Sequence, residues 1–320
     1  MRNGPRPRHE QSFPFLFYQV IPVLGVGLAL QPEDEFLGLL DEAIRRDVDF
    51  YEVTPETLWW EEDDGSLRGN SFFHRLVALK KQTNKQVVGH GVGLSLSGQS
   101  RRDEARRKRW LSRIAEDHKS LQFAWYTDHL GISAPAGMAA TLPLPVWQTE
   151  SSARFLTRQL RRLQNIVPFV GVENSVFYFT PQDPLREPAF LKQALAEQGM
   201  HLLLDLHNVY TTAQNVGFDP MEYLQQIDFD LVIELHVSGG TMSDASWLPS
   251  GKSLRLDSHD DAIPDRVWEL FDWVLPRCPK LKGVTLERME GTVKPHDVPL
   301  IREELHRIKA TLIRQGLYRG

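Results

Sequence analysis

Side chains that can bind metal ions stand at the ends of short apolar segments along this chain. Six of them, each at or just after the end of such a segment, are His90, His129, Glu173, Asp205, His236 and Glu287. They follow one another at intervals of 39, 44, 32, 31 and 51 residues, and Asp257 and His259 fall within the last interval. Each interval is roughly one strand–helix unit, and a parallel α/β barrel opens the carboxyl ends of all its strands onto one face. The pattern therefore predicts one pocket that holds several metal ions.

The donor types limit which metals fit this pocket. Imidazole and carboxylate ligands without thiolate suit iron, manganese or zinc better than magnesium or calcium. A carboxylate at a barrel rim must be paired, hydrogen-bonded or bound to metal, and Glu173 has no basic residue beside it. Glu287 either bridges ions or pairs with its neighbour Arg288. We predict Glu173, Asp205 and Glu287 as the catalytic carboxylates, and the residues alone leave iron and zinc open.

Three further donors have two interpretations each. Asn208 follows Asp205 closely and is either an amide ligand or an ordinary turn residue. Asp257 and His259 have a spacing that lets two side chains of one loop bind the same ion, but the carboxylate could equally orient the histidine. Both interpretations remain open from the residues alone.

Apolar segments that are predicted strands alternate with amphipathic segments that are predicted helices. Mostly apolar strands are typical of a parallel sheet that is buried on both faces. We therefore predict an α/β fold, a single-domain (β/α)8 TIM barrel over residues 21–320, with residues 1–20 as an N-terminal tail or lid. The strands are expected at 21–30, 48–53, 85–96, 121–127, 166–172, 200–206, 229–237 and 281–287. The helices are expected at 32–46, 71–82, 101–120, 150–165, 188–198, 219–227, 263–277 and 301–315.

Composition narrows the class of protein. The 320 residues carry a net charge of −5 with a pI near 6.1, which argues against a general nucleic-acid-binding protein. The single cysteine, Cys278, cannot form an intrachain disulfide, so a reducing, cytoplasmic location is expected. The apolar stretch near the N-terminus is short and interrupted by proline, which argues against a signal peptide or a membrane span.

Seven segments together resemble one known group of enzymes, the multinuclear non-haem iron-dependent oxidases. This group includes the methanobactin-biosynthesis oxidase and relatives that modify ribosomally made peptides. The resemblance covers about residues 22–290 and rests on HGVGLSL, DHL, VENSVFY, LLDLHNVYTTAQNVGFDP, IELHVSGG, LDSHDDAIPDRVWELF and TLE. It implies a xylose-isomerase-like TIM barrel, two or three iron ions of mixed valence, and dioxygen as co-substrate. The implied substrate is a precursor peptide, modified at a cysteine or a C-terminal acidic residue; the need for a separate leader-recognition protein is left open.

The resemblance also assigns the ligands. It implies that His90, His129, Glu173 and Glu287 hold one iron, and that Glu173, Asp205, His236 and Glu287 hold the next, both glutamates bridging. A third, weaker site is implied at Asn208, Asp257 and His259. The related zinc-dependent endonucleases carry histidine at the position of Asn208, which favours the oxidase branch.

The chain departs from the pattern of that group around the pocket. Gly240 stands where the group often has a second histidine, and Thr57 follows Glu56 where it often has asparagine. Arg288 stands where an aromatic residue is usual. These departures concern the substrate more than the metal ligands. We predict Arg288, Arg255 and Trp59 as substrate-binding residues. The two arginines either pair with a peptide carboxylate or only neutralise nearby acids. The Trp59 indole covers either the pocket or the core.

Two other functions are considered. One is a zinc- or manganese-dependent hydrolase or isomerase on the same barrel, acting on a phosphodiester or a sugar, because fold does not fix chemistry. The other is a catalytically idle barrel that serves as a binding subunit, which the retention of every candidate ligand argues against.

Overall fold

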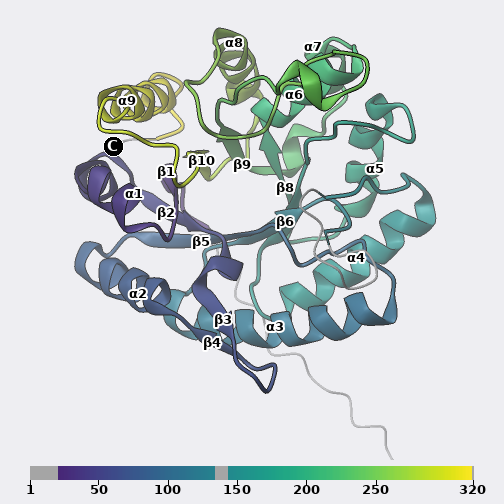
Figure 1. The fold of residues 1–320 in the computed structure, drawn as a ribbon. Helices are drawn as coiled ribbons and strands as arrows, with labels where there is room; N and C mark the ends of the chain where they lie inside the picture. The colour runs from purple at the N-terminus through teal and green to yellow at the C-terminus, as the bar shows by residue number, and fades with distance from the viewer. Residues whose placement is uncertain (1–20, 134–142, 319–320) are drawn as a thin grey trace, which may run out of the picture.

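The computed structural model describes residues 21–133 and 143–318. Eight parallel strands close into a barrel, in the order β1-β10-β9-β8-β7-β6-β5-β2, with helices around it (Figure 1). This confirms the predicted single-domain (β/α)8 barrel; the tail or lid predicted at residues 1–20 lies outside the described residues. The strands are β1 (Gly25–Leu30), β2 (Phe50–Val53), β5 (Gln86–Gly91), β6 (Tyr126–His129), β7 (Val170–Glu173), β8 (Met200–Asp205), β9 (Val232–Val237) and β10 (Gly283–Leu286).

The helices lie outside the barrel. The α-helices are α1 (Asp34–Leu39), α2 (Ser71–Thr83), α3 (Arg101–Leu121), α4 (Glu150–Gln164), α5 (Glu187–Ala194), α6 (Leu206–Val216), α7 (Pro220–Leu224), α8 (Asp265–Val274) and α9 (Val298–Arg314). Short 3-10 turns occur at Pro55–Leu58, Pro184–Arg186, Phe229–Leu231, Ala245–Trp247 and Leu275–Arg277, and a π-helical turn at Ala43–Asp47. Among the described residues, no helix is both long and apolar enough to cross a membrane.

Three elements differ from the sequence prediction. The helix expected at 32–46 ends at Leu39 and resumes as the π-helical turn. Residues 206–216, expected as the end of a strand and a turn, form α6, because the Asp205 side chain accepts the Asn208 N–H and caps the helix. The loop after β2 contains an antiparallel hairpin of β3 (Trp59–Glu61) and β4 (Leu67–Gly69).

The amino-terminal end of the barrel is filled by apolar side chains. Phe50, Val88, Trp125 and Ile233 are buried there, and the Phe50 and Trp125 rings meet edge to face with centroids 5.8 Å apart. Such layers make a barrel interior a packed core rather than a pore. A ligand can therefore reach the centre of the barrel only from the carboxyl ends of the strands.

Strand register sets the candidate ligands at one level. His129 is the Cα partner of Glu173, and Asp205 is the Cα partner of His236. Because alternate residues of a strand point to the same face, these pairs present their side chains to the barrel interior together. Residues distant in sequence thus converge at the carboxyl ends of the strands.

Candidate metal centre

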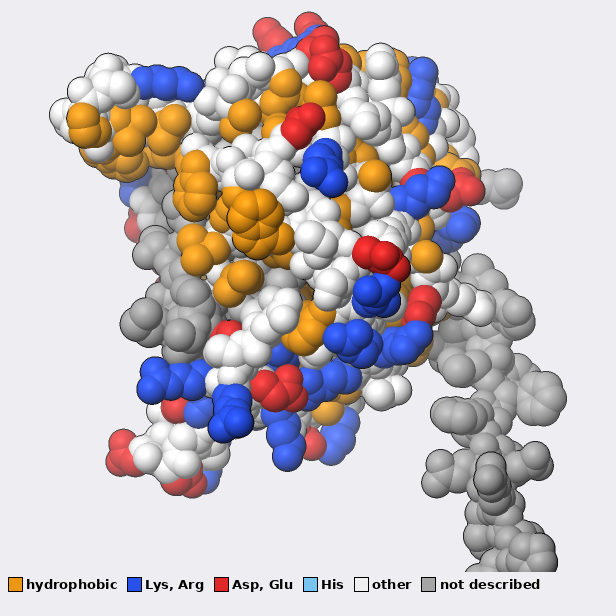
Figure 2. Space-filling model, turned by 90° about the vertical axis from the view of Figure 1, so that its right-hand side faces the viewer, with side chains coloured by type: hydrophobic (Ala, Val, Ile, Leu, Met, Phe, Trp, Pro, Cys, Tyr) orange, Lys and Arg blue, Asp and Glu red, His pale blue; other side chains and the backbone are white. Residues whose placement is uncertain are grey.

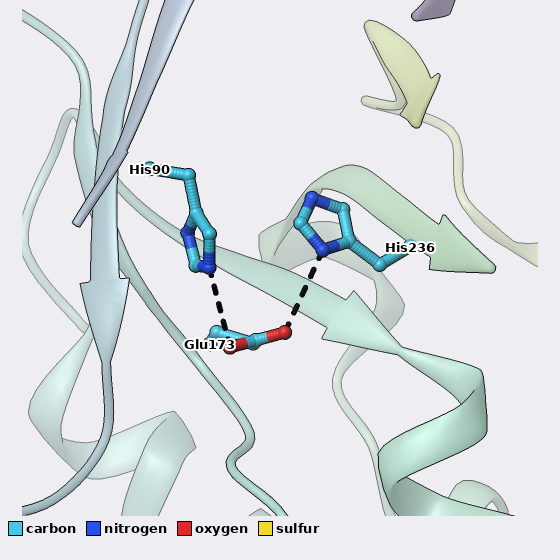
Figure 3. A group of neighbouring side chains, drawn as sticks. All are labelled: His90, Glu173 and His236. Carbon is cyan, nitrogen blue, oxygen red and sulfur yellow. Dashed lines mark ion pairs between the residues drawn. The ribbon is translucent and has the colours of Figure 1, made fainter. Parts of the chain in front are cut away.

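Glu173 lies in the middle of the predicted ligand set. Its Oε2 atom is 2.9 Å from His129 Nε2 and 3.4 Å from His90 Nε2, and its Oε1 atom is 3.6 Å from His236 Nδ1. Figure 3 shows His90 and His236 pointing from either side at the two oxygens of this carboxylate. One carboxylate therefore faces histidines from three other strands.

A second group shares Glu173 and extends across the barrel. Ligand atoms of Glu173, Asp205, His236 and Glu287 all lie within 4.8 Å of one another, and all four residues are buried. His236 Nδ1 lies 3.1 Å from Glu287 Oε2. The structure thus brings together all six strand-end residues that the sequence pattern indicated.

The contacts between these atoms suit metal ligation better than hydrogen bonding. Five buried atoms make no well-aligned hydrogen bond to the described residues: His90 Nε2, Glu173 Oε2, Asp205 Oδ2, His236 Nδ1 and Glu287 Oε2. Ligands at about 2.0–2.2 Å from an ion are separated from one another by about 2.8–3.6 Å, which is the range of the distances above. Leaving such atoms unpaired is costly, so the set fits divalent cations held between them.

The electrostatics of the centre point the same way. Burial raises the pKa of Asp205 well above its usual range, and the carboxylates of Glu173 and Glu287 raise it further. Burial alone lowers the pKa of His129, but Glu173 more than offsets this and raises the pKa to about 9. Without cations the centre must hold protons to balance its buried carboxylates. Metal ions remove that requirement because they supply the positive charge directly.

A carboxylate that the sequence analysis missed lies behind His236. Glu52 Oε2 is 2.8 Å from His236 Nε2, and both side chains are buried. Burial raises the pKa of Glu52 to about 8, while His236 opposes the rise. If Nε2–H donates to Glu52, Nδ1 keeps its lone pair for an ion, the arrangement by which an outer carboxylate fixes the tautomer of a metal-ligating histidine. An acidic residue inside the apolar segment FYEV is the signal that could have identified it.

Glu234 is a second buried glutamate beside Glu52, and its contacts are different. Its two oxygens accept hydrogen bonds from Trp125 Nε1 at 2.5 Å and Thr285 Oγ1 at 2.6 Å. Its nearest approach to His236 Nε2 is 3.8 Å. Glu234 is therefore satisfied by the barrel itself, and only Glu52 is well placed to orient His236.

We expect Glu52→Gln to lower the metal affinity of the centre by roughly 10- to 100-fold, because the amide is a weaker partner for the His236 N–H than a carboxylate. Metal-binding isotherms of the refilled protein measure this. Glu234→Gln is the matched control, since Glu234 is equally buried but bonds to other partners; it should change the affinity less than threefold. If both substitutions lowered the metal affinity equally, Glu52 would have no specific role in orienting His236.

A third group lies on the side of the centre formed by the long loop between β9 and α8. Asp257 Oδ1 is 2.8 Å from His259 Nε2 and 3.1 Å from His207 Nδ1. His259 also lies 3.6 Å from Glu287 Oε2, which links this group to the other two. His259 has a left-handed backbone with φ of 51°, a strained conformation that is typical of functional sites.

His207 joins Asp257 and His259 in this third group, whereas the role predicted for Asn208 stays a prediction. Asn208 Nδ2 instead faces Glu173 Oε1 at 3.3 Å and donates to Asn174 O at 3.2 Å, while its Oδ1 is buried without a partner. Gly240 stands where the resembled group often has a second histidine, and it leaves room for the His207 ring. A Cβ atom on Gly240 would lie 2.2 Å from Leu256 O and 3.1 Å from His207 Cε1. Position 240 therefore has no space for a side chain, and the His207 ring lies beside it.

The three predicted substrate-binding side chains have partners within the chain. Trp59 is buried and donates to Asp117 Oδ2 at 2.5 Å, so the indole covers the core, not the pocket. Arg255 lies over the Tyr210 ring at 4.8 Å. Arg288 is buried and pairs with Glu304 Oε2 at 2.5 Å. These contacts favour structural roles for Trp59 and Arg288.

Arg288→Ala is expected to destabilise the fold by about 3 kcal/mol or more, because it leaves Glu304 buried without its partner. Burial already raises the pKa of Glu304, and Arg288 opposes that rise. Denaturant unfolding measures the change, and Arg288→Ala combined with Glu304→Gln should recover part of it. Unchanged stability together with weaker peptide binding would return Arg288 to a substrate-binding role.

Known proteins match most of the length of this chain. The family described as "RiPP precursor modification enzyme MbnB/TglH/ChrH" matches residues 24–312. A protein of Caulobacter vibrioides named "UPF0276 protein" is 30% identical over 298 residues, which cover 92% of this chain and 97% of that protein. A protein of the same designation from Nitrosospira multiformis is 27% identical over 285 residues, which cover 88% of this chain and 91% of that protein.

Solved structures show the same fold at low identity. A xylose isomerase domain protein from Planctomyces limnophilus superposes with a TM-score of 0.55 at 15% identity, covering 92% of this chain and 97% of that chain. Endonuclease IV from Thermus thermophilus superposes with a TM-score of 0.52 at 16% identity, covering 89% of this chain and 99% of that chain. The barrel is thus of the xylose-isomerase-like type.

Proposed function

The chain belongs to the family of RiPP precursor modification enzymes MbnB/TglH/ChrH, and from this premise we propose that it is a multinuclear non-haem iron oxidase. Its proposed substrate is a ribosomally made precursor peptide, modified at a cysteine or a C-terminal acidic residue with dioxygen as co-substrate. The observation that carries the proposal is the set of buried nitrogen and oxygen atoms that face one another without aligned hydrogen bonds.

We assign the residues to three ion-binding groups that share carboxylates. His90, His129 and Glu173 would hold the first ion. The second ion would be held by Glu173, Asp205, His236 and Glu287. Glu173 faces His90 and His129 with one oxygen and His236 with the other, as a bridging carboxylate would. Asp257, His259 and His207 hold the third ion, with Glu287 as the link.

The two sides of the centre differ in their access to solvent. His236 and Asp205 are completely buried, whereas the side chains of His129 and His259 are 19% and 15% exposed. A substrate entering between the loops therefore reaches the ions on the side of His129 and His259. The buried side excludes water and keeps its ligands fixed, Glu52 orienting His236 from behind.

Iron in such a centre supplies one-electron redox chemistry with dioxygen, which zinc does not. The protein's part is to hold the ions at fixed positions and the peptide side chain beside them, since positioning of reactants contributes a large share of rate acceleration. Histidine binds metal in its neutral form. Burial alone lowers the pKa of both exposed-side histidines, but Glu173 raises the pKa of His129 to about 9 and Asp257 raises the pKa of His259 to about 10, so metal binding is expected to release protons.

Dioxygen consumption tests the proposal. Protein loaded anaerobically with iron is mixed with oxygenated buffer and a cysteine peptide, a peptide with a C-terminal aspartate, or a serine peptide. We expect consumption above background with one of the first two and a peptide mass change that matches it. No consumption with either, at full iron content, would contradict the oxidase assignment for these residue types.

A further inference from the structure

Exposed apolar side chains concentrate in the loops that follow the carboxyl ends of the barrel strands. Among the described residues twelve large apolar side chains are exposed, and eight of these lie in the loops that follow the carboxyl ends of barrel strands. Four of the eight are aromatic: Trp60, Trp147, Phe179 and Trp247 are 55%, 61%, 63% and 64% exposed. On the flank shown in Figure 2, hydrophobic side chains gather in the upper left part, and Lys and Arg side chains gather below them. Exposed aromatic clusters on a soluble surface are typical of binding sites.

These four aromatic residues come from four different loops. Trp60 lies in the β3–β4 hairpin after β2, Trp147 follows β6, Phe179 follows β7, and Trp247 lies in the loop between β9 and α8. The loops after β6, β7 and β9 also carry or follow ligands of the centre, namely His129, Glu173 and Asp257. The aromatic residues therefore belong to the rim through which the centre is reached.

The same loops are acidic. Among the described residues, the segments 31–33, 54–70, 92–100, 130–133, 143–149, 174–186, 238–264 and 287–297 lie between the strands and the next helices. Without the candidate ligands Asp257 and Glu287, they contain twelve Asp and Glu against six Lys and Arg, in a chain whose net charge is only −5. Acids on the rim include Asp63 and Asp64 in the hairpin and Asp260 and Asp261 in the long loop, all of them exposed or half-buried.

Three of the six basic side chains of these loops are engaged by contacts within the protein. Arg288 pairs with Glu304, Arg255 lies over Tyr210, and Lys252 Nζ donates to Asn215 O at 2.7 Å. Among the acids, Glu61 and Glu62 pair with Arg109 and Arg68. Asp63, Asp64, Asp260 and Asp261 form no ion pair with the described residues, so the rim offers aromatic surface and negative charge. That combination favours a positively charged apolar ligand and disfavours a polyanion such as nucleic acid.

We propose that this rim, defined by Trp60, Trp147, Phe179 and Trp247 and the acids of the same loops, binds the substrate peptide through apolar side chains flanked by Lys or Arg. The proposal rests on the proposed function for the identity of the ligand as a peptide, and it adds the composition of the segment that enters the centre. Aromatic rings supply large contact area and also attract cationic side chains.

Binding of three short peptides tests the proposal. The probes are acetylated and amidated Lys-Phe-Cys-Leu-Lys, Glu-Phe-Cys-Leu-Glu and Lys-Ser-Cys-Asn-Lys, titrated anaerobically into the full-length, metal-loaded protein. All three carry the same cysteine, so any thiolate–metal bond contributes equally to each. We expect the first peptide to bind at least tenfold more tightly than either of the others, with the preference over the acidic peptide declining as salt is added.

Substitutions on the rim locate the binding surface. Trp60→Ala and Trp247→Ala should each weaken binding of the first peptide at least fivefold while metal content and melting temperature stay unchanged. Ile313→Ala is the matched control, because Ile313 is exposed at the far end of α9 from the rim, and it should leave the affinity unchanged.

The outcomes separate this proposal from the proposed function. Equal affinity for the three peptides, or no effect of the rim substitutions, overturns the proposed surface even if dioxygen is consumed. Tight, charge-dependent binding without any dioxygen consumption supports the surface and counts against the oxidase.

Discussion

Glu173→Gln is expected to remove at least two metal ions per chain and to abolish activity. The reason is geometric: one oxygen of Glu173 faces His90 and His129, and the other faces His236. The amide keeps one neutral oxygen donor and places an N–H₂ group against histidine nitrogens. One ion therefore loses this ligand, and both ions lose the negative charge that the carboxylate supplies. Elemental analysis of anaerobically purified protein, with circular dichroism as a check on folding, measures the loss.

The control for this variant is the same substitution at another buried glutamate. Glu187 is buried and accepts a hydrogen bond from Tyr223 Oη at 2.7 Å, and it belongs to none of the three ion-binding groups. Glu187→Gln should keep the full metal content. If Glu173→Gln lost no more than one ion, the bridging role would be wrong, and Glu287 would have to link the ions alone.

Asp257→Asn is expected to remove one ion and leave the others. Asp257 contacts only His259 and His207 among the candidate ligands, and the link of this group to the rest runs through Glu287. Burial raises the pKa of Asp257, but the two histidines outweigh this and hold it well below the usual range. The ionised carboxylate is therefore the main negative charge at the third ion. Metal content and the spectrum of the remaining ions measure the result.

His207 and Asn208 can be distinguished by the same measurement. His207→Gln should reduce the third ion to the level of Asp257→Asn, because the His207 ring completes the group around Asp257. Asn208→Ala should affect the second ion instead, since Asn208 faces Glu173. Loss of two or more ions in Asp257→Asn would show that the third group is not separable from the centre.

The convergence of the candidate ligands was predictable from the sequence because each lies at or just after the end of an apolar segment that forms a barrel strand. His129, Glu173 and Asp205 are the last residues of β6, β7 and β8. Parallel closure of the barrel brings strand ends together regardless of their distance in sequence. Spacing along the chain was therefore sufficient to predict that these residues lie together, and their role as metal ligands stays a prediction.

Other features depend on contacts that spacing does not reveal. Glu52 stands inside a strand, and only the barrel's closure brings it to His236, 184 positions away. Asp205 was expected to end a strand, but it also caps α6, which turns His207 into a helical residue beside Gly240. Trp59 and Arg288 were expected at the pocket, whereas long-range partners on α3 and α9 draw both into buried positions.

The identity and number of the metal ions test the central claim most directly. Elemental analysis of the full-length protein, purified without oxygen and without added chelator, should find two to three iron ions per chain and at most traces of zinc or manganese. Mössbauer spectroscopy of the same sample should show iron in more than one oxidation state. Stoichiometric zinc or manganese in place of iron, or a folded protein that binds no metal when refilled, would contradict the account.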